Sequence, residues 1–162
     1  MNLLLLKQLS IISSFAGAIF GLLTLMPWVG LFTFLILITC ISAFIIVYLK
    51  KYDLIGIMSL RDGCIYGALI GFISFIAFSV VYTPISMLLG WLISSYSQGF
   101  LRFFLTGGFG SFFVLLMLII FAAGMSALFN ACSGLATAYV YELITGVKKG
   151  ANENTSIDFE IK

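Results

Sequence analysis

Long apolar runs alternate with short polar breaks along this chain, and the runs have the length of helices that cross a membrane. A helix needs about 20 mostly apolar residues to span the hydrocarbon of a bilayer. Runs of this kind occupy residues 9–27, 29–49, 63–82 and 111–144. The sequence therefore predicts an all-α polytopic integral membrane protein with four transmembrane helices, contained in a transmembrane domain over residues 1–146.

The residues between the runs set the expected helix ends. A short turn at residues 27–30 joins the first two runs, which predicts an antiparallel hairpin. The third helix is expected to begin at Asp62 or Gly63, where the Asp62 carboxylate can accept hydrogen bonds from free N–H groups of the first turn. Thr83 and Pro84 are expected to end that helix, because proline interrupts helical hydrogen bonding.

Residues 84–108 show a different pattern, in which small or polar residues recur every four positions opposite a leucine-rich face. This pattern predicts a weakly amphipathic helix, and hence an interfacial or re-entrant segment between the third and fourth spans. The final run would measure about 50 Å as one helix. It is therefore expected either to tilt and protrude or to bend near Gly124 or residues 132–134. Residues 147–162 are polar and without a hydrophobic period, which predicts a disordered cytoplasmic tail.

The basic residues are distributed unequally between the two predicted sides of the membrane. With four spans, one side holds seven of them: Lys7, Lys50, Lys51, Arg61, Lys148, Lys149 and Lys162. The other side holds Arg102 alone. Basic residues favour the cytoplasmic side, so both termini are expected to be cytoplasmic.

The composition supports a membrane protein and argues against several functions. Hydrophobic residues make up 62% of the 162 positions, charged residues 9%, and there is no histidine. The net charge of +2 gives no reason to expect a nucleic-acid partner. No nucleophile has a plausible base, so no catalytic, cofactor-binding or metal-ligating residue is predicted and the chain is interpreted as not an enzyme. Cys40, Cys64 and Cys132 form no CxxC pair and are interpreted as small buried apolar side chains.

Small residues spaced by four positions form the clearest motif. They are Ser13, Gly17 and Gly21 in the first span, and Gly63, Gly67 and Gly71 in the third. In a bilayer, small residues allow helix backbones to approach closely, which supplies much of the packing energy. These positions are therefore predicted to be helix-packing residues. Packing within one monomer is favoured, and a subunit interface or a pore remains the alternative.

Two polar residues interrupt the last apolar run. Asn130 lies in a stripe with Ser126 and Gly134, and a buried amide in a membrane marks either a helix contact or a wet cavity. Glu142 is the one carboxylate between residues 109 and 144. An intramembrane carboxylate can relay protons, but Glu142 is close to Lys148 and could also reach water at the membrane edge.

The segment Arg61-Asp62-Gly63 leads into the glycine-spaced third helix. In this respect the chain resembles uncharacterised bacterial four-span membrane proteins, mainly over residues 10–82. The resemblance rests on glycine spacing, so it implies a multi-pass protein of the bacterial inner (plasma) membrane but no specific activity.

These patterns lead to one functional hypothesis and one alternative. The chain is expected to be a non-enzymatic membrane protein that packs with itself or serves as an accessory subunit of a membrane complex. Its expected partners are the lipid bilayer and either further copies of the chain or a larger membrane complex. The alternative is a small channel or transporter with a polar path near Asn130 and Glu142.

Overall fold

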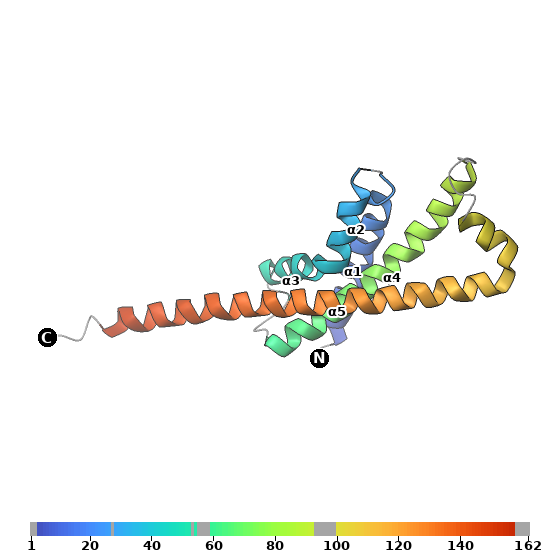
Figure 1. Cartoon of the computed structure of the whole chain (residues 1–162). Helices are drawn as coiled ribbons and strands as arrows, with labels where there is room; N and C mark the ends of the chain where they lie inside the picture. Colours follow the sequence, from blue (N-terminus) through green and yellow to red (C-terminus); the bar gives the residue numbers. More distant parts are fainter. Residues whose placement is uncertain (1–2, 27, 53, 55–58, 93–99, 158–162) are drawn as a thin grey trace.

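The computed structural model describes residues 3–26, 28–52, 54, 59–92 and 100–157, and for 3–4, 90–92, 100–109 and 145–157 it describes the backbone alone. The regular structure of these residues is entirely helical (Figure 1). The helices are α1 (Leu3–Leu23), α2 (Gly30–Thr39), α3 (Ile41–Lys51), α4 (Leu60–Leu92) and α5 (Phe100–Ile157).

The helices have the length and composition of membrane spans. Within the described residues, three stretches are long and apolar enough to cross a membrane: Leu5–Leu23, Leu60–Leu89 and Gly110–Ile144. The bent pair of α2 and α3 makes a fourth if it is counted as one span. Large apolar side chains are widely exposed, among them Phe121 at 72%, and such a surface is compatible with contact to lipid. The prediction of an all-helical chain with helices of membrane-spanning length is confirmed to this extent.

Close contacts show that α1 and α4 run in the same direction. A Cβ atom added at Gly17 would meet the backbone of Ser74, and one added at Gly21 would lie 3.2 Å from the carbonyl oxygen of Phe78. The residue numbers rise together along both helices, which makes the pair parallel. Parallel neighbours must be joined by a connection that returns to the starting end, and α2 and α3 provide it.

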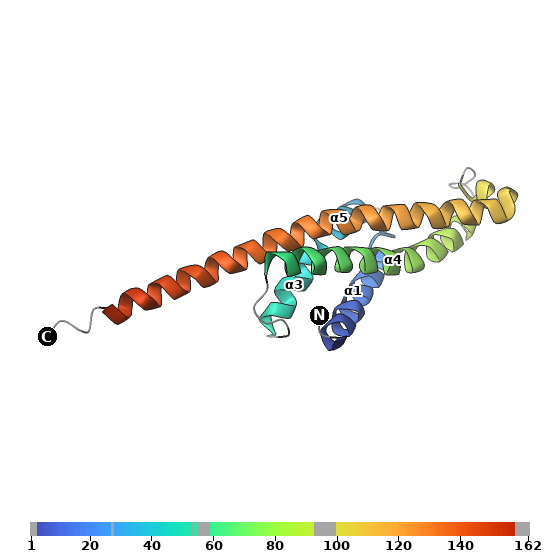
Figure 2. The same ribbon diagram turned by 90° about the horizontal axis from the view of Figure 1, so that it is seen from below.

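The contacts between α4 and α5 run in opposite directions. A Cβ atom at Gly67 would meet the backbone of Asn130, and one at Gly71 would lie 2.7 Å from the carbonyl oxygen of Ser126. Farther along, a Cβ atom at Gly134 would meet the backbone of Gly63. Both views show α5 returning along α4 (Figures 1 and 2). The glycines of α1 therefore face α4, and those of α4 face α5.

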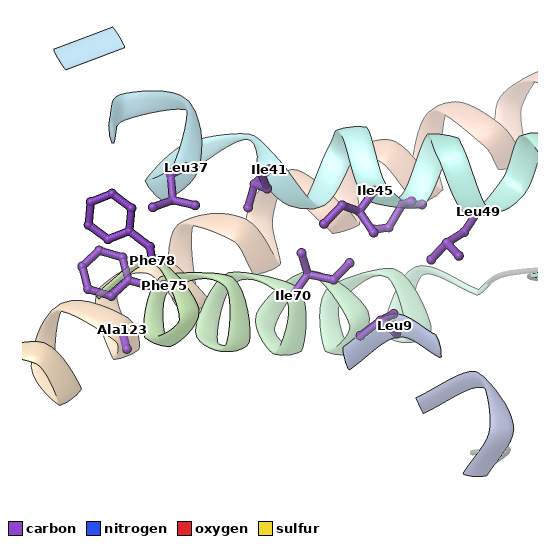
Figure 3. Packing of buried hydrophobic residues seen from close by; sticks show 10 residues of the cluster. Leu9, Leu37, Ile41, Ile45, Leu49, Ile70, Phe75, Phe78 and Ala123 are labelled. Carbon is purple, nitrogen blue, oxygen red and sulfur yellow. The ribbon is translucent and has the colours of Figure 1, made fainter. Parts of the chain in front are cut away.

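The apolar core lies where α2 and α3 pass over α4 (Figure 3). All five helices contribute buried side chains to it. They are Leu9 from α1, Leu37 from α2, Ile41, Ile45, Ile46 and Leu49 from α3, Ile70, Phe75 and Phe78 from α4, and Ala123 from α5. Ser13 and Ser74 are also fully buried. Their hydroxyl groups donate to carbonyl oxygens one turn back in their own helices, at 2.7 Å for Ser13 and 2.6 Å for Ser74. The small polar residues of the packed faces are thereby satisfied without water.

The start of α4 is a capping box, and the helix begins at Leu60, before the Asp62 or Gly63 that the sequence pattern predicts. Asp62 accepts hydrogen bonds from both the hydroxyl group of Ser59, at 2.8 Å, and its N–H, at 3.3 Å. In return the N–H of Asp62 donates to the Ser59 hydroxyl oxygen at 3.2 Å. This reciprocal arrangement satisfies N–H groups that have no partner inside the helix. The sequence pattern identified Asp62 as a cap but did not reveal Ser59.

The expected end of the third span at residue 82 is wrong, because α4 continues through Pro84 to Leu92. Proline removes one helical hydrogen bond, but helices in a membrane tolerate it when nearby groups satisfy the backbone. The carbonyl group that loses its helical donor at Pro84 is that of Val80, four residues back. Beyond the proline, the hydroxyl group of Ser86 donates to the carbonyl oxygen of Thr83 at 3.0 Å.

The predicted interfacial or re-entrant segment at 84–108 is divided between two long helices. Its first part belongs to α4 and its last part to α5, which begins at Phe100. Residues 93–99 lie outside the described part of the chain.

The C-terminal segment also differs from the expectation. α5 has no break between Phe100 and Ile157, so of the two alternatives for the last run the bend near Gly124 or residues 132–134 is not seen, and the disordered tail expected from residue 147 is helical at its start. Residues 147–157 are helical, and 158–162 lie outside the described part. Extending an existing helix adds one hydrogen bond per residue fixed, so an established helix continues beyond the apolar run that anchors it.

Gly67→Ala is expected to destabilise the protein, and Gly124→Ala is not. The methyl group at position 67 would collide with the backbone of Asn130, whereas a Cβ atom at position 124 has no atom within 4 Å. Overpacking of this kind costs about 1–3 kcal/mol, while Gly124→Ala gains up to about 1 kcal/mol in helix propensity. Thermal unfolding of both variants in detergent provides the measurement. Equal melting temperatures for the two would contradict the close α4–α5 contact.

Candidate functional site at the broken helix

The second apolar run forms two helices and not the continuous span predicted over 29–49. α2 and α3 meet at Cys40 with a bend of 67°. The break leaves carbonyl groups at the end of α2 and N–H groups at the start of α3 without their usual helical partners. Inside a membrane there is no water to replace those partners, and each unsatisfied group costs several kcal/mol. The break therefore requires polar groups from elsewhere in the chain.

The side chain of Asn130, on α5, supplies these groups. Its Nδ2 donates to the carbonyl oxygen of Ile38 at 2.8 Å and to that of Leu37 at 3.1 Å. Its Oδ1 accepts a hydrogen bond from the N–H of Ser42 at 2.9 Å. The Ser42 hydroxyl group completes the junction by donating to the backbone oxygen of Asn130 at 2.8 Å. One amide thus serves both the C-terminal end of α2 and the N-terminal end of α3.

The neighbouring residues fix the position of this amide. Nδ2 also lies 3.0 Å from the Ser126 carbonyl oxygen and 3.3 Å from the Ser126 hydroxyl oxygen. The two N–H groups of Nδ2 are shared among four acceptors. The Ser126 hydroxyl group donates to the carbonyl oxygen of Gly71 at 3.2 Å. A Cβ atom at Gly71 would lie 2.6 Å from the Asn130 Cβ and 2.9 Å from Nδ2, so a residue without a side chain is needed there.

The junction is closed to any further ligand. Ser42, Ser126 and Asn130 are fully buried. Within the described part of the chain, every buried side-chain nitrogen or oxygen has a hydrogen-bond partner. In transporters with discontinuous helices, free carbonyl groups at the break coordinate ions. Here the Asn130 amide takes the place that such an ion would occupy, so the arrangement holds two half-helices together.

Glu142, the second residue of the predicted polar path, is not part of this junction. It is exposed, whereas Asn130 is buried. Twelve residues of helix separate the two, a distance of about 18 Å along the axis and about a third of a turn around it. The structure therefore does not bring Asn130 and Glu142 together.

The predicted packing residues lie in the contacts around the junction. Gly17 and Gly21 are buried against α4, and Gly63, Gly67 and Gly71 are buried against α5, while Ser13 is buried on the same face of α1 as its two glycines. The sequence pattern did not reveal Ser42, although an isolated serine two residues after Cys40 in an apolar run was a usable signal.

The cysteines differ from the expectation that all three are buried. Cys40 and Cys132 are exposed and Cys64 is half-buried, and all three are free. Cysteine is apolar enough to face lipid as well as protein, so its position in an apolar run does not determine its burial. The described residues contain no group of three or more potential metal ligands.

Comparisons with known proteins gave no match for this chain. A scan against protein-family models, a search of curated proteins and a search of solved structures each found no match to the chain.

Asn130→Ala is expected to destabilise the protein by about 2–5 kcal/mol, because it leaves several buried backbone groups unpaired at about 1–3 kcal/mol each. Thr137→Ala is the matched control, since the Thr137 hydroxyl group bonds only within α5, to the Ser133 carbonyl oxygen at 2.8 Å. Thermal unfolding in detergent gives the stability, and hydrogen exchange at the Ser42 amide reports the junction itself. Slow exchange at Ser42 in the Asn130→Ala variant would show that the amide does not seal the break.

Proposed function

We propose that this chain is a non-enzymatic integral membrane protein with four membrane crossings, which packs with itself or as an accessory subunit of a larger membrane complex. The observation that supports this function best is the closed junction at Asn130, where the polar groups buried between helices are used up by helix packing. A protein whose buried polar groups bind one another serves as a scaffold more readily than as a site for chemistry.

The helix directions support four crossings. α1 and α4 are parallel and both have the length of a span, so the chain between them returns to the side on which α1 begins. This return makes the α2–α3 pair a broken span. A re-entrant loop would instead leave the chain on the side where α1 ends, and α4 could not then run parallel to α1. The antiparallel α5 then provides the fourth crossing.

The placement of basic residues supports cytoplasmic termini. Lys7 near the start of α1, Lys51 at the end of α3 and Arg61 at the start of α4 are all exposed. Figures 1 and 2 place these three helix ends at the same end of the group formed by α1 to α4, beside the middle of α5. Basic residues gather on the cytoplasmic side, and we assign this end to the cytoplasm of a bacterium whose inner (plasma) membrane holds the protein.

The surface of α5 supports association with other helices. Phe113, Met117 and Phe121 recur every four residues and are exposed at 64%, 70% and 72%. A continuous apolar face of this kind fits lipid and also fits the helices of a larger complex.

A small channel or transporter remains the second candidate, because a broken helix is typical of transporters. In that function Glu142 would exchange protons with a path leading past Asn130. The sealed break and the separation of the two residues favour the packing function over this one.

The crossing pattern can be tested with single cysteines in a variant that lacks Cys40, Cys64 and Cys132. Met26→Cys, in the turn after α1, and Leu54→Cys, in the connection after α3, both replace exposed residues. A membrane-impermeant thiol reagent is expected to label them from opposite sides. Labelling from the same side would make α2 and α3 a re-entrant loop.

The packing function predicts no ion flux. In mild detergent, the protein is expected to purify as a defined homo-oligomer or with a stoichiometric partner, as native mass spectrometry would measure. After reconstitution, proton flux should equal that of protein-free vesicles, both in the wild type and in Glu142→Gln, which keeps the side-chain shape but cannot exchange a proton. A pH-dependent flux that Glu142→Gln abolishes would make the protein a transporter.

A further inference from the structure

The outward face of α3 carries an ordered series of side chains. One face of this helix is buried in the core through Ile41, Ile45, Ile46 and Leu49. The opposite face exposes Phe44, Val47, Tyr48 and Lys51 at helical spacing, followed by Tyr52 just after the helix. We call these five residues the α3 outer stripe. Within α3 it changes from the apolar Phe44 and Val47, through Tyr48, to the cationic Lys51, and Tyr52 adds a second aromatic ring after the lysine.

This order matches the cross-section of one leaflet of a bilayer. Acyl chains contact apolar side chains, tyrosine prefers the boundary between hydrocarbon and headgroup, and lysine extends toward the phosphate. Phe44 is 64% exposed and Val47 45% exposed, so an acyl chain can reach them. The rings of Tyr48 and Tyr52 lie 4.8 Å apart between centroids and so form a single aromatic surface at the C-terminal end of α3.

The cationic end of the stripe keeps its charge available for an anion. Within the part of the chain that the structure describes, neither Lys51 nor Arg61 forms an ion pair, and Asp62 is engaged by Ser59 in the cap of α4. Both basic side chains are exposed. The end of α3 and the start of α4 lie at the same end of the molecule in both views (Figures 1 and 2).

We propose that the α3 outer stripe binds one anionic phospholipid, with its acyl chains on Phe44 and Val47 and its headgroup phosphate at Lys51, assisted by Arg61. The charge decides between lipid classes, because a basic residue near a headgroup favours anionic over zwitterionic lipid by about fivefold. This inference goes beyond the proposed function and does not depend on it, since a transporter and an accessory subunit could both hold such a lipid.

The test is native mass spectrometry of the full chain released from nanodiscs of equal parts phosphatidylglycerol and phosphatidylcholine. The wild type is expected to retain one phosphatidylglycerol. Lys51→Gln should reduce this retention by about fivefold. Lys7→Gln is the matched control, because Lys7 is exposed at the same end of the molecule but lies on α1. It should leave the retention unchanged.

Two further variants distinguish a lipid bound at this stripe from a general attraction of the basic end to the membrane surface. Phe44→Ala should weaken retention of both lipids. Lys51→Arg should preserve the preference for phosphatidylglycerol because it keeps the charge. This variant still tests the site if Lys51→Gln folds poorly. Equal losses in Lys51→Gln and Lys7→Gln would mean a diffuse attraction to the membrane surface and would overturn the site. Displacement of the lipid by inorganic phosphate would overturn it too, because it would identify a site for a free anion.

Discussion

The architecture depends on a rule of membrane interiors, that a backbone hydrogen bond lost in hydrocarbon must be replaced by the protein itself. The break at Cys40 violates the continuity of one helix, and the Asn130 amide restores the lost bonds from another. An amide suits this task because it carries a donor and an acceptor on one planar group. A hydroxyl group has a single proton and could donate to only one of the two α2 carbonyl groups, and a carboxylate at neutral pH can only accept, so neither could replace the amide.

The glycine stripes acquire a specific purpose in this context. Close approach of α4 and α5 brings Asn130 over the break, and the missing side chain at Gly71 leaves space for the amide. At Gly17, where α1 packs on α4, the nearest atoms to a Cβ would be those of the Ser74 backbone, and no polar side chain is positioned there. The two glycine stripes therefore differ in function although their spacing is the same. The stripe of α1 allows close helix contact, and the stripe of α4 also positions a polar side chain.

Sequence patterns predicted the helical class and the apolar runs well, because hydrophobicity and length are local properties that the bilayer constrains strongly. They failed where tertiary contacts decide the local structure. Nothing near Cys40 resembles a helix terminus, and the break becomes stable only through a residue on α5. The prediction at Pro84 failed in the opposite sense. Proline usually ends a helix, but α4 continues through it. At the candidate site, Asn130 could be singled out as a paired amide. Ser42 could be noticed as a serine in an apolar run but could not be matched to Asn130, because pairing across 88 positions leaves no periodic signal.

The distance along the chain between Ser42 and Asn130 has a consequence for biogenesis. Proteins are made from the N-terminus, so α2 and α3 are complete well before α5 has been synthesised. Until then the facing ends of the two half-helices lack the partners that Asn130 supplies. The break is closed only by α5, which follows α2 and α3 along the chain. A product truncated before residue 130 retains the unpaired backbone by which a cell could distinguish it from a longer chain.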